Sequence, residues 1–201
     1  MFRQFLSALV LSGLLAVSPA PAFSATVSFD DPAYILGKPD APITIVEYSS
    51  YTCNHCAAFH KEVVPLLKKE WIDTGKVKLI SRDFPLDQVA LGISMLTYCA
   101  PKDKYLALKE AFFLRQDQWI QSKNLRLDLF TIAREASGLS EPTSAKCLAD
   151  QELAKQLQER QRDSVDELNI NATPTFTVNG QIIRGAPSYE ELVKVIRSAG
   201  G

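Results

Sequence analysis

The chain has 201 residues, of which 46% are hydrophobic, so it is long enough for one core domain with or without an insertion. Its 22 basic and 23 acidic residues give a formal net charge of -1 and form no long run of either sign. We therefore expect no nucleic-acid partner, because binding to a phosphate backbone requires clustered positive charge.

The first residues have the pattern of a secretory signal peptide. Arg3 is followed by an apolar run at 5–17, and then by prolines and small residues. The pattern predicts a signal peptide at 1–24 with cleavage after Ser24, and cleavage after Ala22 is the alternative. An uncleaved membrane anchor also stays open, although the prolines end the apolar run short of the roughly 20 residues that a spanning helix needs. We expect export to the periplasm, where disulfides persist.

After a lead-in at 26–42, which is expected to form a terminal strand and a loop, the β-branched and apolar residues at 43–49 predict a strand. A helix follows from about Cys53. Cys53 and Cys56 thus form a CxxC pair in its first turn, where free backbone N–H groups and the helix dipole favour a negative charge. Because the thiolate is the reactive form of cysteine, this predicts a redox dithiol in which Cys53 attacks and Cys56 resolves. We predict no cofactor other than the disulfide of this pair.

Glu47 lies inside the apolar strand, where a buried carboxylate without a partner is costly. Two interpretations stay open. Glu47 lies on an exposed face of the strand, or it is a buried acid that relays protons near the dithiol. The sequence favours neither.

The chain has two histidines, His55 and His60, on either side of Cys56. We expect the imidazole of His55 to stabilise the neighbouring thiolate as a cation. His60 could join Cys53 and Cys56 as a zinc ligand, but a structural zinc site needs a fourth ligand that the chain does not offer nearby. We therefore predict no metal and a solvent-exposed His60.

The helix after the CxxC pair is predicted to run to about Trp71, with a kink at Pro65. A second strand at 77–81 follows, so strand, helix and strand form a βαβ unit whose strands are parallel. The next stretch has helical periodicity, with one helix stopped by Gly138, and predicts an all-helical insertion at about 88–169.

Strand patterning returns at 173–178 and 181–184, and the Asn-Gly pair between these runs predicts a β-hairpin. Pro174 cannot donate a backbone hydrogen bond, which predicts an edge strand or a place where another chain approaches. A capping box at Ser188 opens the last helix, and Gly200 ends it.

Cys99 and Cys147 lie 48 positions apart and outside any CxxC motif. In an oxidising compartment we expect them to form a structural disulfide. The loop-entropy model values such a bridge at about 4 kcal/mol. The alternative is a pair of buried free thiols that pack like small apolar side chains.

Taken together, a βαβ unit with CxxC at the helix start, a helical insertion, and a hairpin headed by Thr173 and Pro174 resemble the DsbA-like family of thiol:disulfide oxidoreductases. The resemblance covers about 43–200. It implies an α/β, thioredoxin-like fold with an inserted all-helical subdomain at about 88–169, within a domain at 25–201.

The resemblance also implies roles for single residues. Cys53 is the nucleophile and Cys56 the resolving cysteine. Pro174 is a cis proline that faces the dithiol, and Thr173 contacts the substrate beside it. The residues implied to tune the redox pair are Asn54, His55 and Glu47, with Arg82 as a candidate ion partner for Glu47.

Two positions depart from the usual pattern of the family. Asn54 replaces a proline, and Thr173 stands where typical DsbA proteins have valine and the related isomerases have threonine. Both positions tune the reduction potential and the choice of partner in the family.

The function implied is that of an exported oxidase that introduces disulfide bonds into newly exported proteins. Its partners are expected to be unfolded proteins with free thiols, and a membrane protein of the DsbB type that reoxidises the dithiol. The alternatives are a disulfide isomerase or reductase of the same fold, and a chaperone-like binder of unfolded chains without catalysis. The family's dimeric isomerases carry an N-terminal dimerisation domain, for which 25–42 is too short, so the oxidase interpretation is favoured over the isomerase. We also expect a monomer.

Overall fold

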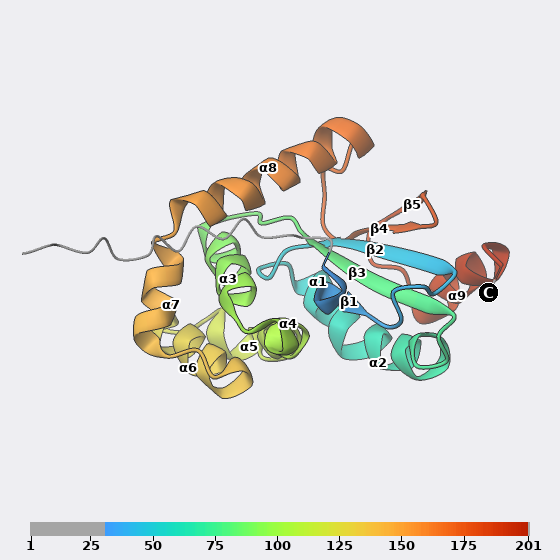
Figure 1. The fold of residues 1–201 in the computed structure, drawn as a ribbon. Coiled ribbons are helices and arrows are strands. Elements are labelled where there is room, and N and C mark those ends of the chain that lie inside the picture. The colour runs from blue at the N-terminus through green and yellow to red at the C-terminus, as the bar shows by residue number, and fades with distance from the viewer. Residues whose placement is uncertain (1–30, 201) are drawn as a thin grey trace, which may run out of the picture.

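The computed structural model describes residues 31–200, and the signal peptide predicted at 1–24 lies outside the described residues. Its centre is a five-stranded sheet with the strand order β1-β3-β2-β4-β5 (Figure 1). The strands are β1 (Ile35–Leu36), β2 (Ile43–Ser49), β3 (Val77–Asp83), β4 (Thr175–Val178) and β5 (Gln181–Arg184).

Strand β2 is flanked on both sides. It pairs in parallel with β3 from Ile43↔Val77 to Ser49↔Asp83, and antiparallel with β4. The parallel pair confirms the predicted βαβ unit, and the short antiparallel β1 on the far side of β3 confirms a strand in the lead-in. The CxxC motif follows the carboxyl end of β2 after the short turn at 50–52, so its position depends on the strand that is paired on both sides.

The crossover from β2 to β3 is a chain of short helical pieces. They are α1 (Asn54–Ala58), the π-helical turn η2 (Phe59–Val63), α2 (Val64–Leu67) and a second π-helical turn η3 (Lys68–Ile72). Pro65 lies at the start of α2, directly after the first π-helical turn. Because proline has no N–H to donate and its ring crowds the preceding turn, the predicted irregularity at Pro65 is found as this interruption.

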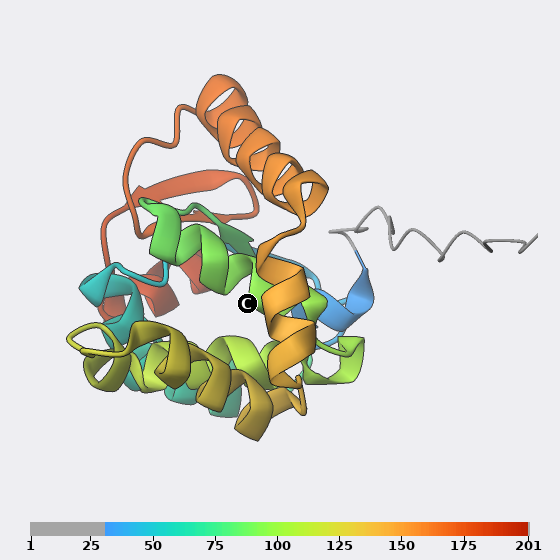
Figure 2. The same ribbon diagram turned by 90° about the vertical axis from the view of Figure 1, so that its left-hand side faces the viewer.

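The predicted insertion is present between β3 and β4 and is entirely helical. In Figure 1 it lies beside the sheet, and Figure 2 shows from that side how α3 lies between α6 and α8. Its α-helices are α3 (Gln88–Cys99), α4 (Tyr105–Leu114), α5 (Gln116–Trp119), α6 (Leu125–Ser137), α7 (Glu141–Leu148) and α8 (Gln151–Leu168). The 3-10 turn η4 (Lys102–Lys104) connects α3 to α4, and another 3-10 turn, η1 (Pro32–Tyr34), lies outside the insertion, before β1. As predicted, Gly138 ends α6, and its left-handed conformation with φ of 78° explains the choice of glycine.

The C-terminal hairpin and helix follow the prediction, except for the place of β4 in the sheet. Ser188 caps α9 (Tyr189–Ser198) through the expected capping box with Glu191. However, β4 lies between β2 and β5 and is therefore not an edge strand. Pro174 avoids the cost of a missing donor because it precedes the first residue of β4.

The buried apolar side chains form two main clusters. One joins the sheet, the crossover helix and α9, and includes Phe59 and Phe176. The other fills the insertion, and it also contains Tyr51, Cys53 and Cys56. The CxxC motif therefore lies where the two clusters meet. Between residues 31 and 200, no helix is both long and apolar enough to span a membrane.

Candidate active site

Cys53 is the residue that caps the helix after β2. Its sulfur accepts the backbone N–H of Cys56 at 3.4 Å, and both cysteines are free thiols in this structure. Cys56 is completely buried, whereas 8% of Cys53 is exposed. Of the two sulfurs, Cys53 is thus the one that a partner can approach.

The environment of Cys53 favours its thiolate. The side chain of Cys56 donates a hydrogen bond to it, and the backbone N–H groups of Cys56 and His55 also point to it. These donors lower the pKa of Cys53 to about 5, although partial burial opposes the shift. The hydroxyl of Thr173 adds to the lowering; it is buried and forms no hydrogen bond of regular geometry.

The pKa of Cys56 is shifted in the opposite direction. Its hydrogen bond to Cys53, its burial and the nearby charge of Glu47 all raise the pKa of its thiol. At neutral pH the pair therefore carries one thiolate, at Cys53, and one proton, at Cys56. This is the arrangement that a nucleophile and a resolving thiol require.

The loop before β4 lies against the dithiol. The sulfur of Cys53 is 3.5 Å from the carbonyl oxygen of Thr173, which is 120 residues later in the chain. The peptide bond between Thr173 and Pro174 is cis, as the resemblance implies, and Pro174 is buried. The structure thus brings Thr173 and Pro174 to the CxxC motif.

The two middle residues of the CxxC motif are exposed. The side-chain oxygen of Asn54 accepts the backbone N–H of His55 at 2.9 Å. His55 acts on Cys53 in this structure through its backbone N–H, while its imidazole faces solvent.

Glu47 is fully buried, so the interpretation as an exposed strand residue is wrong. Its Oε2 accepts hydrogen bonds from Nε2 of His60 at 3.0 Å and from the hydroxyl of Ser81 at 3.4 Å. Burial alone raises the pKa of Glu47, but the charge and hydrogen bond of His60 and the charge of Lys109 outweigh it, so the pKa is lowered.

Two further expectations, the exposure of His60 and the pairing of Glu47 with Arg82, are also wrong. His60 is not solvent-exposed, since only 6% of it is accessible and its ring stacks on Phe113 with 4.0 Å between the ring centres. Arg82 is not the partner either, because it follows Ser81 on β3 and successive side chains of a strand point to opposite faces. In residues 31–200, no three histidine, cysteine or acidic side chains are grouped as metal ligands.

A second buried ion pair, which was not predicted from the sequence, lies close to the site. Nζ of Lys109 on α4 donates to Oδ1 of Asp83 at 2.7 Å and to the hydroxyl of Tyr51 at 3.2 Å. All three side chains are buried. A signal was present, because Lys109 is spaced one helical turn from Tyr105 and Phe112 on the buried face of α4.

Gln116 on α5 was missed as well. Its buried amide donates to the carbonyl of Tyr51 at 2.6 Å and to the carbonyl of Cys53 at 3.1 Å. The insertion thereby holds the turn that carries the nucleophile. No local pattern distinguishes Gln116 from any other polar residue of a helix.

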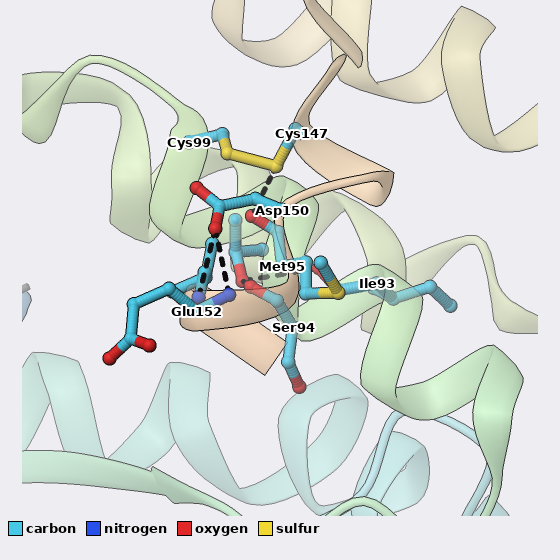
Figure 3. Close-up of a disulfide and its surroundings, with 9 residues drawn as sticks. Ile93, Ser94, Met95, Cys99, Cys147, Asp150 and Glu152 are labelled. Atoms are coloured by element: carbon cyan, nitrogen blue, oxygen red, sulfur yellow. Dashed lines mark hydrogen bonds between the residues drawn. A yellow bond between two sulfur atoms is a disulfide. The ribbon is translucent and has the colours of Figure 1, made fainter. Parts of the chain in front are cut away.

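The other two cysteines form a disulfide at some distance along the chain from the CxxC pair. Cys99 at the end of α3 and Cys147 in α7 are bonded, with 6.3 Å between their Cα atoms (Figure 3). The sulfur of Cys147 also lies 3.0 Å from the carbonyl oxygen of Met95. The bridge therefore ties α7 to α3 within the insertion.

Comparisons with known proteins agree with this geometry. A family model described as thioredoxin matches residues 30–198. The crystal structure of Wolbachia pipientis α-DsbA1 is similar with a TM-score of 0.75 and 30% identity, over 83% of this chain and 89% of that one. Disulfide bond formation protein D of Bacillus subtilis is 28% identical over 166 residues, which are 81% of this chain and 74% of that protein.

A Rickettsia bellii protein with the provisional name protein-disulfide oxidoreductase is 31% identical over 159 residues, or 79% of this chain. The chain spans only 61% of the length of that relative.

Proposed function

The chain belongs to the thioredoxin family, among its DsbA-like disulfide oxidoreductases, and from this premise we propose that it is an exported oxidase that donates the Cys53–Cys56 disulfide to newly exported proteins. The observation that carries the proposal is the contrast within the pair. Cys53 has a pKa of about 5 and is accessible, whereas Cys56 is buried and its pKa is raised.

The contrast supports the following reaction. A substrate thiolate attacks the sulfur of Cys53, the Cys53–Cys56 bond breaks, and Cys56 leaves as a thiolate that takes up a proton. A second substrate thiolate then attacks the substrate sulfur of the mixed disulfide. A substrate disulfide forms, and Cys53 leaves as a thiolate. Because the leaving thiolate is stabilised, the reaction is favoured in the direction of substrate oxidation.

Each turnover leaves two electrons on the Cys53–Cys56 dithiol, so the proposal requires a partner that accepts them. We propose a membrane protein of the DsbB type for this role and the periplasm as the compartment. The protein is proposed to work as a monomer whose own disulfide is its redox group. Substrates are proposed to be unfolded chains with free thiols, which reach Cys53 beside the backbone of Thr173 and Pro174.

A disulfide isomerase is the second candidate, because threonine precedes Pro174 as it does in the isomerases related to the DsbA-like family. The two activities differ in reduction potential. Equilibration with glutathione is expected to give an oxidase a reduction potential above about -150 mV, whereas isomerases and reductases have lower reduction potentials. A chaperone-like binder need not exchange thiols with glutathione at all.

The catalytic assignment is tested by trapping. Two variants, Cys56→Ala and Cys53→Ser, are first treated with oxidised glutathione, which converts the accessible Cys53 of Cys56→Ala to a glutathione mixed disulfide. A thiolate of a reduced, unfolded substrate protein then attacks the sulfur of Cys53 and glutathione leaves as a thiolate, so Cys56→Ala is expected to accumulate a mixed disulfide between Cys53 and the substrate, and Cys53→Ser is expected to form none. The adducts are identified by mass spectrometry after acid quenching. The matched control is the wild type, in which exchange completes and adducts stay rare. Adducts that form through Cys56 in the Cys53→Ser variant contradict the roles assigned here.

A further inference from the structure

A pocket of about 550 Å³ lies within the helical insertion, between α3, α6 and α8, with one residue of α7 in its lining. Figure 2 shows α3 between the other two long helices. The volume is in the range of small-molecule sites, about 300 to 1,000 Å³. The reaction proposed at Cys53 uses none of the residues that line this pocket, so the pocket needs an explanation of its own.

Two of the helices line the pocket along two turns each. On α3 the lining residues follow the spacing i, i+3, i+4 and i+7 from Gln88 to Met95, and on α8 the same spacing runs from Gln151 to Gln158. This spacing marks one face of a helix, and seven residues of helix extend about 10 Å. The pocket is therefore a groove between two helix faces, a shape that suits an extended chain.

The lining is apolar inside and polar at the rim. The buried lining residues are all apolar: Leu91, Met95, Leu129 and Phe130. The exposed lining residues are all polar: Gln88, Arg126, Gln151, Lys155 and Gln158. In the described part of the chain no acidic residue lines the pocket, although the protein has 23 acidic and 22 basic residues. The rim thus carries positive charge only.

Gly92 in the middle of α3 keeps part of this space open. Glycine is unfavourable inside a helix, so a packing or backbone reason is expected for it. Its backbone is helical, and an added Cβ atom would meet only Cδ2 of Leu148, at 3.4 Å, an ordinary contact distance. Neither the backbone nor a close neighbour therefore requires glycine here. The absent side chain leaves room in the groove.

The two cations at the rim are available to an anion. The guanidinium of Arg126 lies over the ring of Phe130, with 4.9 Å between Cζ and the ring centre, and forms no ion pair within residues 31–200. This contact holds the charge at the apolar wall of the groove. Lys155 pairs only with Glu159, at 3.8 Å, and both side chains are exposed, so the pair contributes little. A guanidinium can bind a carboxylate with two parallel hydrogen bonds.

The disulfide of the insertion fixes one wall of the groove. The sulfur of Cys147 lies 3.0 Å from the carbonyl oxygen of Met95, as Figure 3 shows, and Leu148 follows Cys147 directly. Met95 and Leu148 both line the pocket, so the bond from Cys147 to Cys99 ties two lining helices together. A preformed wall lowers the ordering cost of binding.

We propose that this groove binds a free fatty acid, with the acyl chain along the apolar interior and the carboxylate at Arg126, and with Lys155 as the second cation. An apolar groove with a purely positive rim matches an anion that carries an apolar chain. A protein partner is the weaker choice, because a stable protein interface buries about 800 Å² on each side, far more than one groove offers. The proposal is independent of thiol exchange at Cys53.

The test is calorimetric titration of the mature protein, with the Cys99–Cys147 bridge intact, by decanoate and by decanol. Decanoate is expected to bind once per chain with a micromolar Kd. Decanol has the same chain without the charge and is expected to bind about tenfold more weakly, the equivalent of one charge-assisted hydrogen bond.

Two substitutions on α6 test the position of the carboxylate. Arg126→Gln is expected to weaken decanoate about tenfold and to leave decanol unchanged, because it removes only the charge contact. Arg134→Gln is the matched control. Arg134 is an exposed arginine of the same helix that does not line the pocket, so this variant is expected to bind both ligands as the wild type does.

A substitution on α3 tests the position of the acyl chain. Gly92→Leu fills the groove and is expected to abolish binding of decanoate and decanol alike, while exchange of Cys53 with glutathione keeps its rate. Gly92→Ala adds one methyl group, so it is expected to cause a smaller loss of affinity. It is also expected to raise the Tm, because alanine favours the helix.

The inference is overturned if decanoate does not bind the wild type, or if a folded Gly92→Leu variant binds it normally. It is also overturned if Arg126→Gln weakens decanoate no more than Arg134→Gln does. If Gly92→Leu does not fold, the two arginine variants and Gly92→Ala decide the question. An acidic amphipathic peptide that binds where decanoate does not would make the occupant a protein segment and the proposal wrong. Each of these outcomes leaves the proposed function intact.

Discussion

Cys53 and Cys56 differ in acidity because their sulfurs take opposite parts in the same hydrogen bond. Cys56 donates and Cys53 accepts, and the helix N-terminus adds further donors on the side of Cys53 only. The division of roles is therefore built into the backbone turn.

The first prediction concerns alkylation of the reduced protein by iodoacetamide. Because the pKa of Cys53 is about 5, its alkylation rate should rise through pH 5 and be nearly constant above about pH 7. Cys56 should remain unmodified in the folded protein. In the unfolded protein, used as control, both thiols should titrate near the ordinary value of about 8.5. Preferential labelling of Cys56 in the folded state contradicts this prediction.

The pattern around the CxxC motif was sufficient to place Cys53 and Cys56 at the start of a helix, but not to predict the buried side chains around them. His60 lies one helical turn from both Cys56 and Val63, so the helical phase alone places it on the buried face. Its polar character suggested exposure. Glu47 and His60 are each unfavourable when buried alone and acceptable together, and a local pattern does not reveal a partner on another element.

At the scale of elements, α4 is joined to the sheet by charge as well as by apolar packing. Lys109 and Asp83 are both buried, with 3% and 2% of their side chains exposed, and Tyr51 shares the ammonium group. Such a pair is weak evidence for stability by itself, because removing two charges from water is costly. Replacing only one of the two residues is nevertheless strongly destabilising, because the charge of the other residue then stays buried without a partner.

The second prediction follows from that asymmetry. Lys109→Met should lower the free energy of unfolding by about 3 to 5 kcal/mol, and adding Asp83→Leu should recover a large part of the loss. Urea unfolding measures both. The control is Lys102→Met, because Lys102 forms an exposed pair with Asp31 and should cost less than about 1 kcal/mol. A double variant that is no more stable than Lys109→Met argues against a simple ion pair.

Most elements could be predicted because their signals are local. The strand at 43–49 is found with the predicted bounds, and Gly138 and Ser188 mark a helix end and a helix start as expected. The place of β4 was missed for the opposite reason. Whether a strand lies inside a sheet or at its edge depends on which strands flank it, and the residues of 173–178 do not encode their neighbours.

At the scale of the whole molecule, the redox state of the CxxC pair is coupled to folding. Only the reduced protein has a thiolate at Cys53, so the hydrogen bonds to that anion stabilise the reduced folded state alone. The folded pKa of about 5 lies below the ordinary thiol value. The contribution is therefore complete above the unfolded pKa and disappears as the pH falls through about 5.

The third prediction is that the reduced protein melts at a higher temperature than the oxidised protein at pH 7. The difference should be larger at pH 8 and should shrink toward pH 5. Calorimetry of both forms at three pH values measures it, with the Cys99–Cys147 bridge confirmed intact in each sample. An oxidised form that melts higher at pH 7 contradicts the oxidase assignment.

The 120 residues that separate Cys53 from the carbonyl of Thr173 also have a consequence for the order in which the chain enters an oxidising compartment. In the proposed export the N-terminus leads, so the CxxC motif arrives before the loop that lies against it. During that interval Cys53 and Cys56 can close on each other at the lowest loop cost, and Cys99 arrives while Cys147 is still missing. An early Cys53–Cys56 bond would leave Cys99 without a competing partner. The enzyme's own correct pairing is thus favoured by the order of its cysteines along the chain.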